Sequence, residues 1–279
     1  MTDDIQTLLD QTLHLNVLSI ERYPKGLTNQ NWLCHCTQGD FMVRWPHEDA
    51  HQIVHREHEA KAMELIQTLG LDVDTLYYDV QTGIKVTRFV ADLKTFDEYE
   101  GDDKIERTAV LMKRLHRLNK TIGHTFDPIA RYHQYASHVK TLPIDPIIAQ
   151  QVIQTLEHFT PRLTLCHNDW VPGNIGFSLT RDYLIDYEYA GDNDPFFDVM
   201  SFITENDLSD DQKAKFMLTY FEGSWTDEEK KRLYAYGDFH NLLWATWAQM
   251  MVESRHELVY QEIRDLKVLA LLNGLNEKR

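Results

Sequence analysis

Two polar stretches in the second half of the chain carry residue types that can support phosphoryl transfer. The first, at residues 166–174, has the sequence CHNDWVPGN, and the second begins where an apolar run ends at Asp186. Phosphoryl transfer needs a carboxylate that orients and deprotonates the attacking hydroxyl, and hard oxygen ligands that hold Mg²⁺ against the phosphates. Asp169 is the predicted base, and Asn174 and Asp186 are the predicted metal ligands. Because Asp, Asn, Pro and Gly are also common in turns, the prediction depends on the joint pattern.

The composition predicts a globular chain with an acidic surface. Of 279 residues 43% are hydrophobic, which is enough for one sizeable core or two small ones, and the formal net charge is −16. This charge repels phosphate backbones and anionic membrane surfaces, so neither nucleic acid nor a membrane is an expected partner. The same field favours a small cationic ligand in any cleft that shares it.

The cysteines predict a reducing compartment. Cys34, Cys36 and Cys166 are odd in number and include no CxxC pair, so neither a disulfide framework nor a cysteine-based zinc site is indicated. The N-terminal residues lack the basic region and cleavage site of a secretion signal, and no run reaches the roughly 18 apolar residues of a membrane span. We therefore expect a cytoplasmic protein.

The residues up to about position 91 alternate in the manner of short strands. Alternation and turn residues predict strands at 17–23, 32–37, 41–45, 75–80 and 84–90. The second and third are joined by a hairpin-type turn at 38–40. Apolar residues at helical spacing predict one helix over 50–69, and Gly70 occupies the position of a left-handed cap.

Helical patterns dominate after Ala91. The predicted helices cover residues 104–119, 128–142, 146–158, 212–222, 227–253 and 258–276. Three short predicted strands, at 162–165, 174–177 and 183–185, surround the polar stretches that carry the candidate chemistry. We predict an α+β chain with a small β-rich N-lobe at residues 1–91 and a larger helical C-lobe at residues 92–279. A ligand is expected in a cleft where the lobes join.

The polar stretches resemble those of the choline/ethanolamine kinase and aminoglycoside phosphotransferase family, a branch of the protein-kinase-like two-lobed fold. The family pattern H-N-D-x-x-x-x-N matches residues 167–174. The segments IDYEYAG at 185–191 and DPFFD at 194–198 are most similar to bacterial choline kinases. The resemblance implies an ATP-dependent and Mg²⁺-dependent phosphotransferase, with Asp169, Asn174 and Asp186 in the roles given above.

The resemblance also implies a nucleotide site in the N-lobe. Its loop would be residues 26–31, in which Gly26, Thr28, Asn29 and Asn31 can approach phosphates closely. With only one glycine, this segment could also be an ordinary turn.

Further nucleotide contacts come from a strand cation, a helix carboxylate and the strand that enters the hinge. Arg44 matches the phosphate-binding cation of kinases, since a guanidinium can bind phosphate bidentately. Glu57 matches the glutamate that pairs with this cation, and Glu59 is the competing candidate. Phe89 and Val90 are candidates to line the adenine site, although either could simply be part of the core.

Two acidic residues near the metal segment match the family pattern. Asp198 resembles the aspartate at a helix start that braces the catalytic loop by hydrogen bonds. Glu188, two residues after Asp186, is assigned to the substrate side of the site, although it could be solvated or linked to the metal through water.

The acceptor site is predicted from aromatic residues near the C-terminus. A quaternary ammonium donates no N–H hydrogen bond, so a site for choline must use aromatic faces and negative charge. Trp244 and Trp247 lie three apart in a predicted helix and can line one pocket, and Tyr260 falls where the family adds another aromatic wall. Glu205 matches an acidic residue of the choline pocket. The alternative is that the two tryptophans belong to the helical core.

These features together predict a kinase that transfers the γ-phosphoryl group of ATP to the hydroxyl of a small cationic alcohol, with choline favoured. Thiamine kinase, ethanolamine kinase and aminoglycoside phosphotransferase are alternatives within the same fold. A catalytically silent module that binds nucleotide or choline is the alternative from another functional class. The sequence leaves open the oligomeric state and the choice between ATP and GTP.

Overall fold

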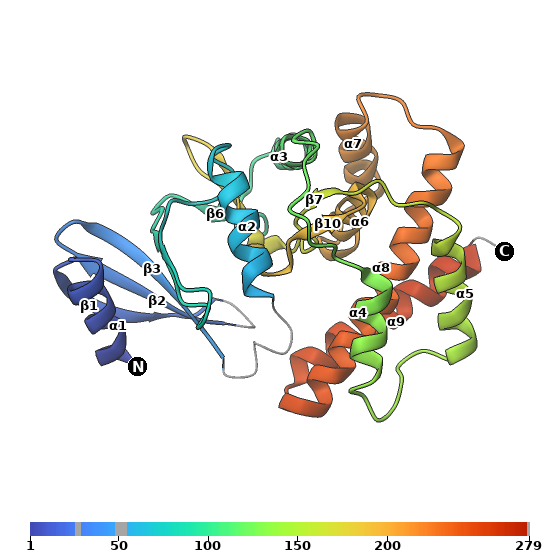
Figure 1. Ribbon diagram of the computed structural model, residues 1–279. Helices are drawn as coiled ribbons and strands as arrows, with labels where there is room; N and C mark the ends of the chain where they lie inside the picture. The colour runs from blue at the N-terminus through green and yellow to red at the C-terminus, as the bar shows by residue number, and fades with distance from the viewer. Residues whose placement is uncertain (26–28, 48–54, 278–279) are drawn as a thin grey trace. The chain divides into compact units, whose positions relative to one another are not determined.

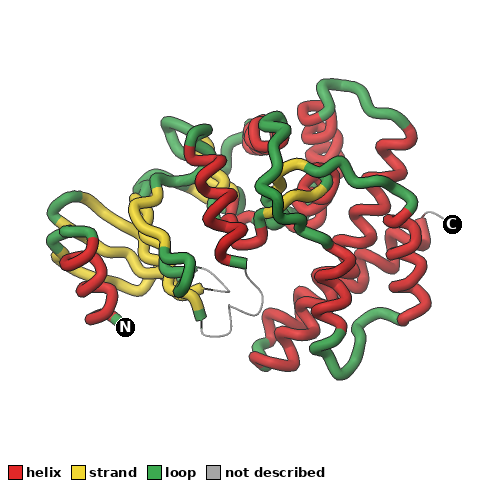
Figure 2. The backbone as a smooth tube through the Cα atoms, in the orientation of Figure 1, coloured by secondary structure: helices red, strands yellow, loops and turns green. Residues whose placement is uncertain are grey.

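The computed structural model describes residues 1–25, 29–47 and 55–277, and it divides into two compact units (Figure 1). The first unit comprises Met1–Leu111 and Pro172–Ala190, and the second comprises Met112–Val171 and Gly191–Arg279. Strands dominate the first unit and helices dominate the second (Figure 2).

The first unit is built on a five-stranded antiparallel sheet with the strand order β1-β2-β3-β5-β4. Its strands are β1 (Val17–Tyr23), β2 (Asn29–Cys36), β3 (Gly39–Pro46), β4 (Thr75–Tyr78) and β5 (Lys85–Arg88). The predicted hairpin turn between β2 and β3 is confirmed, and Gly39 there has a φ of +120°, a value that favours glycine. The five predicted strands of this region are therefore all present.

A hydrophobic core lies between this sheet and the N-terminal helical segment. The segment consists of α1 (Thr2–Thr7) and the π-helical turn η1 (Leu8–Thr12), which bury Ile5 and Leu9. These two side chains join the same cluster as Cys34, Phe41 and Val86 of the sheet. Cys34, Cys36 and Cys166 are buried free thiols, so the cysteines of the sheet behave as small apolar residues.

Helix α2 (Arg56–Gln67) belongs to the first unit and is shorter than the helix predicted over 50–69. His55 is extended, with φ −99° and ψ 91°, so the helix begins at Arg56, and residues 48–54 lie outside the described part of the chain. At the other end Gly70 has a φ of +58°, which confirms the predicted left-handed conformation.

A second, three-stranded sheet in the first unit contains segments that are distant in the sequence. Strand β6 (Lys94–Thr95) pairs with β8 (Ile175–Phe177), which pairs with β9 (Asp182–Leu184). Two single turns of 3-10 helix, η3 (Pro172–Asn174) and η4 (Tyr187–Tyr189), flank the β8–β9 hairpin.

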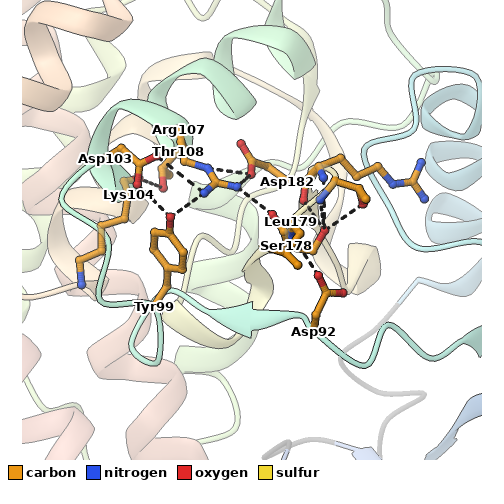
Figure 3. A network of polar contacts seen from close by, with 11 residues as sticks. Asp92, Tyr99, Asp103, Lys104, Arg107, Thr108, Ser178, Leu179 and Asp182 are labelled. Carbon is orange, nitrogen blue, oxygen red and sulfur yellow. Dashed lines mark hydrogen bonds and ion pairs between the residues drawn. The ribbon is translucent and has the colours of Figure 1, made fainter.

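Helix α3 (Lys104–His116) is tied to the β8–β9 hairpin by a polar network (Figure 3). Arg107 donates from Nε to Oδ1 of Asp182 at 3.0 Å and from Nη1 to the Tyr99 hydroxyl at 2.8 Å. Asp92 accepts from the backbone N–H of Leu179 at 2.9 Å. These contacts join residues 92–111 to residues 172–190, and both segments belong to the same compact unit as the N-terminal sheet.

The second unit is a set of helices around α8, with a small two-stranded ladder. Its elements are α4 (Pro128–Ala136), α5 (Pro146–Glu157), β7 (Thr164–Cys166), β10 (Gly191–Asn193), α6 (Pro195–Glu205), α7 (Asp210–Tyr220), α8 (Asp227–Arg255) and α9 (Leu258–Glu277). Helix α8 contacts α4, α5, α6 and α9, which explains why a continuous stretch from Phe239 to Ala248 is buried. Thr226 and Glu229 begin this helix with a reciprocal capping box.

Helix α6 is absent from the helices predicted above, although its first residues carry a clear start signal. Asp194 caps the helix by accepting from the Phe196 N–H at 3.0 Å, and Pro195 follows at the first helical position. The other predicted helices of this unit are present, with ends that differ by a few residues. No helix in the described ranges is long and apolar enough to cross a membrane.

Candidate active site

The β8–β9 hairpin brings the two predicted metal ligands to the same end of a strand pair. Ile175 pairs with Leu184, so Asn174 and Asp186 both lie just beyond this pair. The Ile185 N–H donates to the Asn174 carbonyl oxygen at 2.9 Å. Asp186 has a φ of +66°, a left-handed conformation that aspartate tolerates better than most residues.

Arg44 is held between two carboxylates of the first unit. Its Nη1 lies 2.7 Å from Oε1 of Glu59 and 2.9 Å from Oδ1 of Asp186. The side chain of Glu59 is fully buried, and that of Asp186 is 29% exposed. Burial alone would raise the pKa of Glu59, but the charge and hydrogen bond of Arg44 outweigh it, so that the pKa is lowered. The arrangement presents one guanidinium beside the predicted metal segment.

The prediction that Glu57 pairs with Arg44 is wrong, because Glu59 makes this contact. Glu57 is exposed, whereas Glu59 shares the buried face of α2 with Ala62 and Ile66. The spacing of these three residues is the helical signal that could have decided between the two glutamates.

Tyr78 is a further member of this cluster and was not identified from the sequence. Its hydroxyl donates to Oε2 of Glu59 at 2.9 Å, and its ring lies 5.9 Å from the Arg44 guanidinium carbon. Tyr78 lies on β4, which is distant in the sequence from Arg44 on β3. Only the order of the strands in the sheet brings Tyr78 close to Glu59 and Arg44. The hydroxyl therefore helps to fix the carboxylate that fixes Arg44.

Glu188 and Asn29 form a second polar pair in the first unit. Asn29 donates from Nδ2 to Oε2 of Glu188 at 2.9 Å, and both side chains are buried. Burial, followed by the negative charge of Asp186, raises the pKa of Glu188 to about 8, although Arg44 and Asn29 act in the opposite direction. The predicted loop residue Asn29 is thus joined to the segment that follows Asp186.

The remaining predicted nucleotide residues are described only in part. Gly26 and Thr28 lie outside the described residues. Asn31 donates from Nδ2 to the Lys25 carbonyl oxygen at 2.8 Å. Phe89 and Val90 are half-buried, and the Phe89 N–H is engaged with the carbonyl oxygen of Asp40 at 3.0 Å. The backbone N–H of Phe89 is therefore committed to the sheet.

The predicted base lies in the second unit, in a loop whose backbone is held on both sides. Asp198 of α6 accepts from the N–H of His167 at 2.9 Å and from the N–H of Asn168 at 2.7 Å. On the other side of Asp169, the Trp170 N–H donates to Oγ of Ser201 at 3.0 Å. Asp169 itself is half-buried between these anchors. The structure therefore supports the predicted bracing by Asp198.

His116 completes the clamp behind this loop. Its Nε2 lies 2.9 Å from Oδ2 of Asp198, and its Nδ1 lies 2.7 Å from the Tyr220 hydroxyl. Because a carboxylate only accepts, Nε2 carries the proton in the bond to Asp198. Burial alone would raise the pKa of Asp198, but hydrogen bonds from His116 and the loop backbone outweigh it and lower the pKa.

The clamp predicts a specific pH dependence of stability. A carboxylate whose pKa is lowered on folding stabilises the folded state above its unfolded pKa, near 3.9, and loses this contribution as the pH falls through the lower folded value. Asp198→Asn is expected to lower the free energy of unfolding by about 2–3 kcal/mol at neutral pH. The difference from the wild type should shrink below about pH 4.

Denaturant unfolding across a pH series measures this difference. Asp207→Asn is the matched control, because Asp207 is exposed and is not in the clamp. A difference between Asp198→Asn and the wild type that stays constant down to pH 2 would contradict the argument.

The predicted aromatic acceptor residues form one cluster in the second unit. The rings of Trp244 and Trp247 have centroids 5.7 Å apart and planes at 84°, and those of Trp247 and Tyr260 are 5.7 Å apart at 82°. Trp244 and Trp247 are each 7% exposed and Tyr260 is 1% exposed. The Trp247 ring is thus nearly perpendicular to each of its two neighbours, an arrangement that combines core packing with ring faces that point in different directions.

A buried histidine supports this cluster and was not identified from the sequence. Trp244 donates from Nε1 to Nε2 of His240 at 2.9 Å, so this nitrogen carries no proton. The other ring nitrogen lies 2.9 Å from Oγ1 of Thr204. Burial, followed by the charge of Lys267, lowers the pKa of His240 well below its usual range. His240 is therefore a neutral acceptor that orients the Trp244 ring.

Glu205 has a partner that the sequence analysis did not anticipate. Its Oε1 lies 2.5 Å from Nζ of Lys267 and 3.7 Å from Nδ1 of His240. Lys267 is itself 6% exposed, so the two charges form an ion pair within the second unit. Glu205 is predicted to offset the charge of a cationic ligand, and in the structure Lys267 already neutralises its carboxylate.

The candidate residues are distributed over the two units, and the comparison with known proteins indicates the type of chemistry to which they belong. A model of the phosphotransferase enzyme family matches residues 19–234, a range that contains Arg44, Asp169, Asn174 and Asp186. The chain belongs to this family. The phosphotransferase fold is the predicted α+β fold, with an N-terminal antiparallel sheet and a helical C-terminal part.

Relatives of this phosphotransferase include choline kinases. It is 28% identical to the protein LicA of Haemophilus influenzae over 247 residues, which cover 82% of this chain and 72% of LicA. The crystal structure of choline kinase LicA from Streptococcus pneumoniae matches with a TM-score of 0.85 and 25% identity, covering 98% of this chain and 99% of that chain. A structure of LicA in complex with AMP matches with a TM-score of 0.82 and 25% identity, covering 98% and 96%.

Proposed function

We propose that this phosphotransferase transfers the γ-phosphoryl group of ATP to the hydroxyl group of choline. Family membership supports a phosphotransferase activity, and the similarity to the choline kinase LicA of Streptococcus pneumoniae supports choline as the acceptor. The single observation that carries the proposal is the buried pair of Arg44 and Glu59, which presents a guanidinium beside Asp186. The positive charge of a guanidinium held in this way attracts phosphate oxygens.

The residues around Asp186 fit a magnesium site. Asp186 offers a partly exposed carboxylate and Asn174 offers an amide, both of which are hard oxygen donors of the kind Mg²⁺ prefers. These two residues would hold the metal, and Arg44 would hold the nucleotide phosphates. Bound Mg²⁺ supplies neutralisation of charge on the transferring phosphoryl group.

Asp169 is the proposed base for the acceptor hydroxyl. Asp198 and Ser201 fix the backbone on both sides of Asp169, so its carboxylate is presented by a loop of defined shape. The carboxylate would accept a hydrogen bond from the acceptor hydroxyl, orient it toward the phosphorus atom and receive its proton. Most of the rate acceleration would come from this positioning and from charge neutralisation.

Choline is proposed as the acceptor because of the cluster of Trp244, Trp247 and Tyr260. A trimethylammonium group is attracted to aromatic faces and makes no N–H hydrogen bond. The perpendicular arrangement of adjacent rings offers faces toward more than one side of such a group. The ion pair of Glu205 with Lys267 leaves the attraction to the ring faces as the main cation-binding contribution of these residues.

An acceptor panel tests the proposal. Choline, ethanolamine, thiamine and an aminoglycoside are offered separately with Mg²⁺ and ATP, and ADP release is measured. Choline is expected to give the highest kcat/KM. Activity with another acceptor alone would keep the phosphotransferase chemistry and overturn the choice of choline. Binding of ATP without ADP release for any acceptor would favour a silent binding module.

Trp244→Leu tests the aromatic contribution directly, because leucine keeps apolar bulk and removes the ring face. The KM for choline is expected to rise about 30-fold, corresponding to a desolvated cation–π contact of about 2 kcal/mol, with the KM for ATP unchanged. Trp225→Leu is the matched control, since Trp225 contacts Phe221 outside the cluster. Equal choline KM values in Trp244→Leu and the wild type would remove Trp244 from the acceptor site.

A further inference from the structure

A cavity of about 370 Å³ lies wholly within the second unit and involves none of the residues proposed above for catalysis or substrate binding. Its wall is formed where several elements end or begin. The end of α3 contributes His116, and the segment after it contributes Asn119. Arg162 lies just before β7. Tyr220 ends α7, and Arg232 lies in the first turns of α8. The volume is within the range of small-molecule sites.

Two guanidinium groups line this cavity. Arg162 is exposed, and its side chain has no ion-pair partner among the described residues. Arg232 is 15% exposed, and its buried Nε has no hydrogen-bond partner in the described part of the chain. The Arg232 guanidinium carbon lies 5.2 Å from the centroid of the Phe196 ring, which keeps its planar face against an apolar surface. Both arginines therefore have N–H groups that can donate hydrogen bonds to a ligand.

The carboxylates that line the cavity are already engaged. Asp194 accepts from the N–H groups of Phe196 at 3.0 Å and Arg162 at 2.8 Å, and it forms an ion pair with Arg232. Glu229 accepts from both the N–H and the hydroxyl of Thr226 in the cap of α8. Asp194 balances the charge of Arg232, and the charge of Arg162 remains without a paired carboxylate. Burial, and then the positive charge of Arg162, lower the pKa of Arg232, although an arginine stays protonated.

We propose that this cavity is a binding site for a small phosphate-bearing molecule, separate from the catalytic groups. The forked donors of Arg162 and Arg232 suit the oxygens of a phosphate group, and the Asn119 amide offers a further donor on the same wall. The cavity is larger than a phosphate ion, so it has room for the organic part of a phosphomonoester beside Phe196 and Phe221. Since the chain carries a net charge of −16, an anion is repelled elsewhere and the site depends on these local cations.

The position of the cavity joins it to the loop that carries the proposed base. His116 is part of the cavity wall and also donates to Asp198, which in turn accepts from the His167 and Asn168 backbone. A molecule that contacts His116 thus touches the residue that is hydrogen-bonded to Asp198, the carboxylate that braces the loop.

Calorimetric titration with glycerol 3-phosphate tests the site. The full chain is saturated with Mg²⁺ and ADP, so that the nucleotide residues are occupied during the titration. One binding event is expected for the wild type, and Arg162→Gln should weaken it about tenfold or more, because one charge-assisted contact is lost. Arg162 is chosen over Arg232, because Arg232 pairs with the buried Asp194 and its replacement could unfold the unit.

Arg117→Gln is the matched control, because it removes the same charge from an exposed residue of the same unit that does not line the cavity. Its affinity for glycerol 3-phosphate should equal that of the wild type. Absence of binding by the wild type would overturn the proposal, as would equal affinities for the wild type and Arg162→Gln. Inorganic phosphate titrated in parallel shows how much of the affinity belongs to the phosphate group alone.

Discussion

Asp169→Asn is expected to reduce kcat about 10²- to 10⁴-fold, because an amide cannot receive the proton of the acceptor hydroxyl. The substitution preserves size, and the backbone on either side stays bonded to Asp198 and Ser201. The affinity for ATP should therefore remain that of the wild type. Steady-state kinetics with choline, together with direct titration of ATP, separate these two quantities.

Asp207→Asn is the control for this substitution, since it makes the same chemical change at an exposed position of the second unit. It should leave kcat unchanged. Turnover by Asp169→Asn equal to that of the wild type would exclude Asp169 as the base. A loss of ATP affinity equal to the loss of kcat would instead indicate that Asp169 acts in nucleotide binding.

Glu59→Gln is expected to destabilise the chain by about 3 kcal/mol, because it leaves the buried end of the Arg44 guanidinium facing a neutral group. Asp186 remains as the second partner of Arg44, so the loss should be at the lower end of the range for a broken buried pair. The orientation of Arg44 should also weaken, and the KM for ATP should rise. Denaturant unfolding and nucleotide kinetics measure the two effects.

Glu57→Gln provides a control two residues away on the same helix. Glu57 is exposed and Glu59 is fully buried, although both substitutions remove one negative charge from α2. Glu57→Gln should change the free energy of unfolding by no more than about 0.5 kcal/mol. Similar effects of the two substitutions would mean that overall charge, rather than the contact with Arg44, determines the result.

Much of the candidate site could be predicted because its residues are concentrated in short stretches. Asp169 and Asn174 lie in one loop, and Asp186 follows the strand that pairs with the segment after Asn174. Arg44 was predicted from the resemblance to kinases, because its position on a strand matches that of their phosphate-binding cation. Patterns of this kind can be recognised in a single sequence, because their residues are close together along the chain.

The partners that complete the site depend on contacts between distant segments. The bond between Tyr78 and Glu59 joins β4 to α2, and the ion pair of Glu205 and Lys267 joins α6 to α9. No spacing rule connects these positions, because the fold alone brings them together. Which glutamate of α2 pairs with Arg44 could, in contrast, have been predicted. Glu59 shares the helical spacing of the apolar residues Ala62 and Ile66, and Glu57 does not.

The fold was predicted more completely than its organisation into units. Alternation and helical periodicity located most of the elements but not α1, β6, β10 or α6, and each of the two compact units is built from two separate segments of the chain. Strand β6 has only two residues, and its partner β8 follows about eighty positions later, so its pairing leaves no local signal. Helix α6 did have such a signal in its Asp-Pro start.

The two-segment construction of the first unit has a consequence for the order in which the protein matures during synthesis. Arg44 and Asp186 are 142 residues apart, and residues 112–171 of the second unit are made between the two segments. A domain that emerges first from the ribosome generally folds first. Here the first unit can gain its β8–β9 hairpin only after residues 112–171 have been translated, and joining its two segments carries the entropic cost of closing a long loop. The nascent chain therefore completes the cluster of Arg44, Glu59 and Asp186 only after Asp169, the proposed base, has been synthesised.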